Sequence, residues 1–360
     1  MVEHGGDIYS HPGVLDFSAN LNPLGMPKAV REAAAQAAAG AEAYPDPSCR
    51  ELAGCLSKAL SVPEEWILFG NGAEELISAM GRVLSGGTCS GSILSGGPLS
   101  AREVLLPVPA FGEYEESFRR QQCRVRHFYL KKEEGYRVPE KILEEITPRT
   151  GVLVLCSPNN PTGICVPRSL LWKILGRCEE TGTFFLLDES FLPFVKGAES
   201  LKSELPHSPH LVMIGSFTKI FSMAGLRLGF CLSSDHGFLH ALREQVPYWN
   251  VSTVAQAAGC AALQEKEYLA ETIPYVEKER ELLKKGLEEK SMRVENSQAN
   301  YLFFHGPEDL GRRLLEQGIL VRDCRNYPGL YAGDFRIAVR TDEENRKFLH
   351  ALEAVWQNRL

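Results

Sequence analysis

A lysine that closely follows an apolar segment is the first candidate for chemistry in this chain. Lys219 stands shortly after the apolar run Leu211–Gly215. A lysine at the end of a buried strand is partly desolvated, which lowers its pKa and favours attack of the amine on a carbonyl to form a Schiff base. Ser216, Thr218 and Arg227 could surround a phosphate, with the guanidinium making a forked contact. A lone lysine in a loop is more often simply solvated, so this motif needs support from others.

Two further polar residues follow apolar segments. Asp188 comes directly after Phe184–Leu187, and ligands of open α/β sheets bind at the carboxyl ends of strands. A buried carboxylate needs a positive partner, and the protonated ring nitrogen of pyridoxal phosphate (PLP) would be one. Asn160 lies in the rigid proline-containing turn Ser157–Gly163, where its amide could donate to a cofactor oxygen. Taken alone, Asp188 could instead cap the next helix, and the turn that contains Asn160 could be an ordinary turn between a strand and a helix.

Three weaker motifs would complete a cofactor site. Gly72 and Ala73 stand between an apolar segment and a helical pattern, where free N–H groups and the helix dipole favour an anion. Phe111 follows another apolar segment and could stack on a planar ring, or could be a core aromatic. Tyr44 lies in a Tyr-Pro-Asp-Pro turn, and its hydroxyl could reach a phosphate, although a plain proline turn is the simpler interpretation.

The elements that must position these residues alternate along the middle of the chain. Short apolar runs without strict alternation are typical of strands buried on both faces, and amphipathic helical patterns lie between them. This order predicts an α/β fold with a mostly parallel sheet covered by helices on both faces. The expected strands are Glu103–Val108, Val125–Leu130, Val152–Cys156, Phe184–Leu187, Leu211–Gly215 and Leu228–Leu232.

The two ends of the chain differ from this middle region. A charged helical pattern at Lys266–Lys290 leads into segregated strands and helices, which suggest a small α+β domain. We therefore expect an N-terminal arm at 1–45, a large domain at 46–264 and a small domain at 265–360. Ser85–Ser100 is dominated by glycine and serine and is expected to be a flexible surface loop.

Composition excludes several classes of protein. The chain has 360 residues, 44% hydrophobic and 24% charged, which favours two globular domains. A net charge of −7 without a basic tract argues against nucleic-acid binding. No apolar run approaches the ~20 residues that span a bilayer, and the first residues show no signal pattern, so we expect a cytoplasmic protein. The 10 cysteines lack zinc-site spacing, so we expect no metal. They are scattered singly through apolar segments, and in a reducing compartment we expect no disulfide between them.

The order of the motifs is more specific than any one of them. They read Tyr-Pro-Asp-Pro, Asn-Gly-Ala-Glu, Pro-x-Phe, Ser-Pro-Asn-Asn-Pro-Thr-Gly, Asp-Glu-x-Phe, Ser-x-x-Lys and then Arg. This order resembles the fold-type I PLP enzymes of the class I and II aminotransferase superfamily, in the branch of the histidinol-phosphate aminotransferases. The resemblance covers nearly the whole chain. It implies a mostly parallel seven-stranded sheet in the large domain, a small α+β C-terminal domain and PLP as the cofactor.

The resemblance also implies a role for each motif. Lys219 would be the catalytic lysine that binds PLP, Asp188 would contact the pyridine nitrogen, Asn160 would lie near the ring hydroxyl, and Phe111 would stack on the ring. Tyr44 would reach the cofactor from the other subunit of a homodimer. The cofactor phosphate would lie among Gly72, Ala73, Ser216, Thr218 and Arg227.

One position departs from this branch. Many of its aminotransferases have a tyrosine three residues after the aspartate, with the hydroxyl on the ring oxygen of PLP. Here that residue is Phe191. The missing hydrogen bond is expected to change the pKa of the lysine–cofactor linkage and to bias the choice of reaction.

The N-terminal arm carries a narrower resemblance, to threonine-phosphate decarboxylases of cobalamin biosynthesis. It rests on residues 4–7 (His-Gly-Gly-Asp), 15–25 (Leu-Asp-Phe-Ser-Ala-Asn-Leu-Asn-Pro-Leu-Gly) and 318–324 (Gly-Ile-Leu-Val-Arg-Asp-Cys), and on Phe191. Two arginines suit a substrate that carries both a carboxylate and a phosphate. By this resemblance the substrate would contact His4, Gly5, Asn20, Asn160, Arg322 and Arg336.

The expected reaction is decarboxylation of O-phospho-L-threonine to (R)-1-aminopropan-2-yl phosphate and CO₂. One alternative is a histidinol-phosphate aminotransferase that uses 2-oxoglutarate, because rotation about one substrate bond separates the two chemistries. Another is a decarboxylase of O-phospho-L-serine, since one methyl group gives only about 1–3 kcal/mol of discrimination. A third is a binding protein without activity on the same scaffold, against which the intact Lys219, Asp188 and Asn160 argue.

Overall fold

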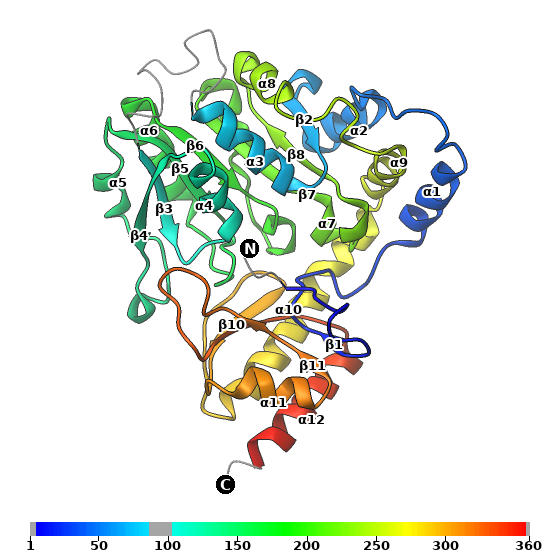
Figure 1. Ribbon diagram of the computed structural model, residues 1–360, viewed down its shortest axis with the longest axis vertical. Coiled ribbons are helices and arrows are strands. Elements are labelled where there is room, and N and C mark those ends of the chain that lie inside the picture. Colours follow the sequence, from blue (N-terminus) through cyan, green and yellow to red (C-terminus); the bar gives the residue numbers. More distant parts are fainter. Residues whose placement is uncertain (1–4, 86–102, 358–360) are drawn as a thin grey trace.

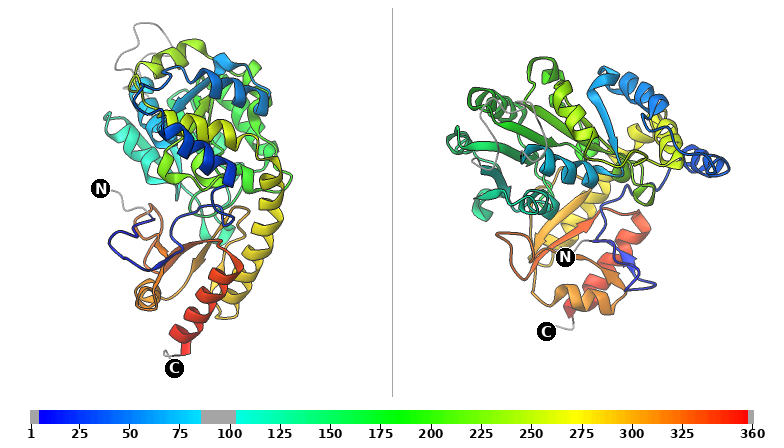
Figure 2. Two further views of the ribbon diagram at one scale, coloured as in Figure 1. Left: turned by 90° about the vertical axis from the view of Figure 1, so that its right-hand side faces the viewer. Right: turned by 45° about the horizontal axis from the view of Figure 1, so that its top comes forward.

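The computed structural model describes residues 5–85 and 103–357 (Figure 1). A seven-stranded sheet with helices forms the larger part of the molecule, and a four-stranded sheet forms the smaller part below it. Figure 2 shows the long helix α10 (Lys266–Glu288) running from the larger part into the smaller one. His4 lies outside the described residues, as does nearly all of the glycine- and serine-rich segment 85–100.

The large sheet is mostly parallel, as the sequence predicts. Its strands are, in spatial order, β2 (Ile67–Gly70), β8 (Gly229–Leu232), β7 (Leu211–Ser216), β6 (Phe184–Asp188), β5 (Thr150–Cys156), β3 (Glu103–Val108) and β4 (Arg124–Tyr129). Only β8 runs antiparallel to its neighbours, β2 and β7. The carboxyl ends of β3, β5, β6 and β7 therefore meet at one edge, which is where α/β sheets bind ligands.

Helices cover both faces of this sheet. Along β6, Phe184 and Leu186 pack with α3, α4 and α8, whereas Phe185 and Leu187 pack with α6 on the opposite face. Successive side chains of a strand alternate between faces, so Asp188 at the end of β6 belongs to the α4 face. The α-helices are α1 (Lys28–Ala38), α2 (Arg50–Leu60), α3 (Ala73–Leu84), α4 (Gly112–Arg119), α5 (Ile142–Glu145), α6 (Arg168–Thr181), α7 (Phe217–Ile220), α8 (His236–Arg243), α9 (Thr253–Ala262), α10, α11 (Leu310–Glu316) and α12 (Asp342–Gln357).

The smaller part is antiparallel and receives the N-terminal arm. Its sheet has the order β12 (Arg322–Asp323), β13 (Asp334–Ala338), β10 (Tyr301–His305) and β9 (Arg293–Val294). In the arm, β1 (Leu15–Asp16) pairs in parallel with β11 (Ile319–Leu320). Pairing with β11 fixes the arm to the smaller part and carries the next residues of the chain toward the space between the two parts.

No helix of the described residues is long and apolar enough to cross a membrane. Within the same residues, no group of three or more His, Cys, Asp or Glu side chains is arranged to hold a metal ion.

Candidate active site

A cavity of about 710 Å³, here called the main cavity, lies between the two parts of the molecule. Its lining comes from the strand ends of the large sheet, from the N-terminal arm and from β12 and β13. Thirteen of the residues that the sequence analysis predicts to bind the cofactor or the substrate line this one cavity. They are Gly5, Asn20, Gly72, Ala73, Phe111, Asn160, Asp188, Ser216, Thr218, Lys219, Arg227, Arg322 and Arg336.

The large sheet supplies what we call the strand-end wall of the main cavity. It consists of Gly72, Ala73, Phe111, Asp188, Ser216, Thr218, Lys219 and Arg227. Asp188 ends β6, and Ser216 ends β7 two residues before Thr218. Phe111 follows β3, and Gly72 precedes α3. Parallel strands place their carboxyl ends at one edge, so local sequence neighbours of each strand become spatial neighbours here.

Lys219 occupies the one-turn helix α7 directly after β7. Its Nζ lies 3.1 Å from the Thr218 Oγ1. Burial, reinforced by the positive charge of Arg227, lowers the pKa of Lys219 to about 8, although the nearby Asp188 acts in the opposite direction. A substantial fraction of this amine is therefore neutral near physiological pH, as attack on an aldehyde requires.

Asp188 is a buried carboxylate held by two donors. The Tyr114 hydroxyl donates to Oδ2 at 2.7 Å, and the backbone N–H of Ser190 donates to Oδ1 at 2.7 Å. Burial raises the pKa of Asp188, and these hydrogen bonds oppose that rise. A cationic ring N–H placed against this carboxylate would stabilise its charge.

The region before α3 forms a cradle for an anion. Gly72 has a φ of +81°, and a Cβ built on it would lie 2.6 Å from the Arg227 Nη2, so the guanidinium passes directly over this glycine. The Ser216 and Thr218 hydroxyls, which line the same cavity, lie 2.7 Å apart. The first backbone N–H groups of α3 have no side-chain cap. Hydroxyls, a guanidinium and free helix N–H groups together suit a phosphate.

The strand-end wall fits PLP in each chemical detail. Lys219 offers an amine of lowered pKa for the aldehyde, and Asp188 offers a carboxylate for the ring nitrogen. The cradle around Gly72 offers donors for the phosphate, and Phe111 lines the same space with an aromatic face. Asn160 also lines the main cavity, where its amide N–H could donate to a cofactor oxygen.

The opposite side of the main cavity, which we call the arginine wall, consists of Gly5, Ser18, Asn20, Arg322 and Arg336. Arg336 is only 5% exposed; its Nη1 donates to the Asn160 Oδ1 at 2.5 Å and its Nη2 to the Ser18 carbonyl at 2.6 Å. The Arg336 Nε has no partner in the described part of the chain, and neither does the buried Asn20 Oδ1. A buried polar atom without a protein partner is most often paired with a water molecule or a ligand group.

Arg322 lies directly opposite Arg336 in the pairing of β12 with β13. It is also 5% exposed, and its Nη2 donates to the Asn326 Oδ1 at 2.8 Å. Its guanidinium lies 5.3 Å from the ring centre of Tyr327. Directly opposed residues of adjacent strands share a face, so two like charges are held side by side at this wall.

The N-terminal arm completes the arginine wall. The backbone N–H of Gly6 donates to the Ser18 Oγ at 2.7 Å, which folds the start of the chain back onto the arm. A Cβ on Gly5 would lie 2.3 Å from the Ser18 carbonyl oxygen, so only glycine allows this approach. His4, the next residue toward the N-terminus, lies outside the described residues.

Tyr44 does not line the main cavity of its own chain. Its side chain is 77% exposed and stacks on Trp249, with ring centres 4.2 Å apart. Any contact between Tyr44 and a cofactor therefore depends on a second copy of the chain.

Phe191 lines the main cavity at the position where many related aminotransferases have a tyrosine. The hydroxyl of its aromatic neighbour, Tyr301, does not replace the hydroxyl of that tyrosine. The Phe191 ring meets the edge of Tyr301, with centres 5.0 Å apart and an interplanar angle of 78°. The Tyr301 hydroxyl is directed elsewhere and donates to the Asn159 carbonyl at 2.9 Å.

Sequence reasoning gave no role to Tyr114 or Ser18, which hold Asp188 and Arg336 in place. Tyr114 follows Phe111 by three residues at the start of α4, a spacing that places both on one helix face. That spacing could have indicated Tyr114. Nothing in the local sequence indicates that the Ser18 carbonyl meets an arginine 318 positions away.

Comparison with known proteins agrees with this geometry. Residues 12–352 match the family "Aminotransferase class I and II", and the chain belongs to it. Enzymes of this family use PLP, so the chain is a member of a PLP-dependent enzyme family.

The relatives carry two different activities. The chain is 35% identical to the threonine-phosphate decarboxylase of Salmonella typhimurium, over 98% of this chain and 96% of that protein. It is 34% identical to the histidinol-phosphate aminotransferase of Methanosarcina mazei, over 94% of this chain and 88% of that protein. The crystal structure of the histidinol-phosphate aminotransferase from Clostridium acetobutylicum superimposes with a TM-score of 0.86 at 26% identity, covering 96% of this chain and 100% of that one.

Proposed function

We propose that this protein is a PLP-dependent decarboxylase of O-phospho-L-threonine, which releases CO₂ and forms (R)-1-aminopropan-2-yl phosphate, a reaction of cobalamin biosynthesis. The observation that carries the proposal is the pair of buried arginines, Arg322 and Arg336, directly opposed on adjacent strands. Two buried guanidiniums on one face of a sheet concentrate positive charge at the main cavity, and this charge attracts anionic groups. A substrate with a carboxylate and a phosphate supplies both anions in one molecule.

Each arginine has its own anion in this proposal. Arg336 holds the carboxylate, because Asn160 and Ser18 already fix its guanidinium beside the strand-end wall. Arg322 binds the phosphate farther along the arginine wall. Asn20 accepts a hydrogen bond from the substrate through its unpartnered Oδ1. Gly5 completes this end of the site from the arm, and the contact proposed for His4 rests on the family resemblance alone.

The residues of the strand-end wall hold the cofactor and move the proton. PLP, when bound, supplies an electron sink for the substrate bond that stands perpendicular to its ring. Asp188 would keep a negative charge against the ring nitrogen, and Phe111 would pack on the ring. Lys219 would bind the cofactor, and its amine, with a pKa of about 8, would be the group that carries a proton to Cα.

The orientation of the carboxylate decides between the two activities of the relatives. If Arg336 holds the carboxylate perpendicular to the ring, CO₂ leaves; if it holds the carboxylate in the plane, the Cα proton leaves and transamination follows. The 34% identity to a histidinol-phosphate aminotransferase makes aminotransfer with 2-oxoglutarate the second candidate. O-phospho-L-serine, which lacks one methyl group, is the second candidate substrate for decarboxylation.

CO₂ release from the purified PLP-loaded protein tests the proposal. With O-phospho-L-threonine and no keto acid, we expect one CO₂ per amine product over many turnovers. O-phospho-L-serine is the matched substrate, with an expected kcat/KM about 10-fold or more lower. Turnover only when histidinol phosphate and 2-oxoglutarate are both present would instead establish an aminotransferase.

The assembly and the domain limits belong to the same proposal. The exposed aromatic group of Tyr44, Tyr248 and Trp249 favours a homodimer in which Tyr44 reaches the phosphate cradle of the partner. We keep 46–264 and 265–360 as the domains, with 1–45 as an arm that pairs with the smaller one. Sedimentation of the holoenzyme, with and without Tyr44→Ala, tests the dimer, and the PLP affinity of that variant tests the contact.

A further inference from the structure

The carboxylate of Asp188 depends on one side-chain donor from outside its own loop. Its Oδ1 accepts from the Ser190 backbone, two residues along the chain, whereas its Oδ2 accepts from the Tyr114 hydroxyl, 74 residues away. Tyr114 is 2% exposed and Asp188 is 5% exposed, so this bond lies almost entirely out of contact with solvent. A buried carboxylate oxygen that loses its donor costs more free energy than the bond itself contributes.

Tyr114 and the candidate stacking residue share one turn of helix. Phe111 is the N-cap residue of α4, and Tyr114 lies three residues later. Their rings meet edge to face, with centres 5.6 Å apart. The start of α4 therefore positions both Phe111, the candidate stacking residue, and Tyr114, the hydrogen-bond donor to Asp188. Burial raises the pKa of Tyr114 well above its usual range, so its hydroxyl keeps its proton and remains a donor.

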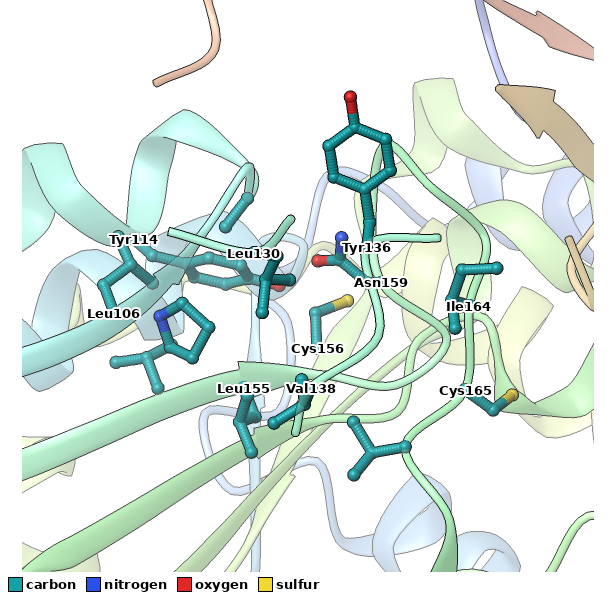
Figure 3. A pocket seen from close by; sticks show the side chains of 14 residues that line it. Leu106, Tyr114, Leu130, Tyr136, Val138, Leu155, Cys156, Asn159, Ile164 and Cys165 are labelled. Carbon is teal, nitrogen blue, oxygen red and sulfur yellow. The ribbon is translucent and has the colours of Figure 1, made fainter. Parts of the chain in front are cut away.

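A second cavity, here called the small cavity, lies behind Tyr114 (Figure 3). Its volume is about 10 Å³, close to the space that one water molecule needs. Tyr114 and Cys156 line both cavities and separate them. Most of the remaining lining is apolar, from residues such as Leu106, Leu130 and Val138. The protein side of Tyr114 thus offers little that could stabilise the Asp188 charge in its place.

We propose that Tyr114 is a positioning residue whose hydroxyl fixes Asp188 in the orientation and charge state that the ring nitrogen of PLP requires. The proton shared by Asp188 and the ring nitrogen lies on nitrogen only while the carboxylate anion is well stabilised. A hydrogen bond from Tyr114 stabilises that anion and so favours the protonated ring. The proposal rests on PLP dependence and holds equally for a decarboxylase and for an aminotransferase.

Tyr114→Phe removes the donor while keeping the ring, and Tyr136→Phe is the matched control. Tyr136 also lines the small cavity, but its ring packs against Phe303 and His305 rather than Asp188. With ¹⁵N-labelled PLP, the ring-nitrogen resonance reports protonation directly and needs no substrate. We expect Tyr114→Phe to move this resonance toward the unprotonated position and to weaken PLP binding about 10-fold or more. Tyr136→Phe should resemble the wild type in both.

A double-mutant cycle tests whether Tyr114 acts through Asp188. In an Asp188→Asn background, Tyr114→Phe should change neither the ring-nitrogen resonance nor the PLP affinity further. In the substrate reaction, Tyr114→Phe should lower kcat and leave the KM nearly unchanged, because the arginine wall is untouched. A wild-type resonance and wild-type PLP affinity in Tyr114→Phe would overturn the proposal, whatever happens to activity.

A fluorine probe covers the case in which Tyr114→Phe does not fold. With 3-fluorotyrosine placed at position 114, addition of PLP to the apoenzyme changes the charge that Asp188 presents to the phenol. The ¹⁹F resonance should therefore shift on PLP binding, and the shift should be smaller in Asp188→Asn, where only the ring current of the bound cofactor remains. An unshifted resonance in a protein that binds PLP would contradict a role for Tyr114 in holding Asp188. Because no substrate is present, this outcome is separate from failure of the proposed decarboxylation.

Discussion

The two walls of the main cavity are built in different ways. Every residue of the strand-end wall stands within a few positions of a strand or helix end, as Asp188 does after β6 and Lys219 does after β7. The arginine wall depends on contacts between distant segments. Arg336 is held by Asn160, 176 positions away, and by Ser18, 318 positions away.

This difference bears on how one family contains several activities. The strand-end wall is fixed by one sheet, so cofactor chemistry is preserved as long as the sheet is. The arginine wall joins the arm, β13 and a turn of the large part, and a small change in any of them reorients the guanidinium. The two relatives with different activities are 35% and 34% identical to this chain, so overall identity does not separate the activities.

Loss of the lysine should break the strand-end wall most severely. Lys219→Ala removes both the covalent attachment of PLP and the proton carrier, so we expect kcat to fall about 10³-fold or more. Borohydride treatment followed by intact-mass measurement should show retained cofactor in the wild type and none in the variant. Lys202→Ala is the control, since its amine donates to the Leu60 carbonyl away from the main cavity. Covalent PLP in Lys219→Ala would mean that another lysine carries the cofactor.

Arg336→Lys should break the arginine wall and leave the strand-end wall intact. An ammonium cannot reproduce the forked contact while also bonding Asn160 and Ser18. We expect kcat/KM for the phosphorylated amino acid to fall about 100-fold, with unchanged PLP affinity and absorbance. Arg340→Lys serves as the control, because Arg340 pairs with Glu344 outside the main cavity. Equal effects of the two changes would show that Arg336 stabilises the fold rather than binding substrate.

Gly5→Ala should disturb the arginine wall less than Arg336→Lys does, because it changes only the position of the N-terminal arm. The added Cβ would meet the Ser18 carbonyl at 2.3 Å, so the arm must shift away from Arg336. We expect the KM to rise about 10-fold while PLP binding stays unchanged, since the shift affects fewer contacts than loss of the guanidinium. Substrate titrations at fixed PLP measure this effect. Gly176→Ala, where a Cβ meets no atom within 4 Å, controls for the substitution itself.

The sequence predicts the strand-end wall better than the arginine wall for a physical reason. Apolar runs at β5, β6 and β7 are buried throughout, so their ends and the polar residues that follow could be placed from pattern alone. The antiparallel direction of β8 could not be predicted from pattern, because the segment Leu228–Leu232 has the same apolar pattern in either direction. Strand direction depends on how the chain crosses the sheet, which local pattern does not encode.

Long-range partners escaped prediction for the same reason. The spacing of Phe111 and Tyr114 gives a shared helix face but not the carboxylate, 74 positions away, that the hydroxyl reaches. The opposition of Arg322 and Arg336 depends on the register of β12 against β13, since a shift of one residue would turn one side chain to the other face. Only the resemblance to a known family gave these arginines a shared role before their register was known.

Phe191→Tyr would sharpen the comparison by adding one hydroxyl to the main cavity at a residue outside the arginine wall. A donor at the ring oxygen of PLP stabilises the deprotonated form of the lysine–cofactor linkage, so its pKa should fall by about one unit, or roughly 1.4 kcal/mol. A pH titration of PLP absorbance measures this shift, and Phe191→Leu, which adds no donor, should leave the absorbance titration in place. Because the arginine wall is unchanged, the KM should move little while any transamination side reaction rises. An unshifted titration in Phe191→Tyr would mean that the new hydroxyl turns away, as that of Tyr301 does toward Asn159.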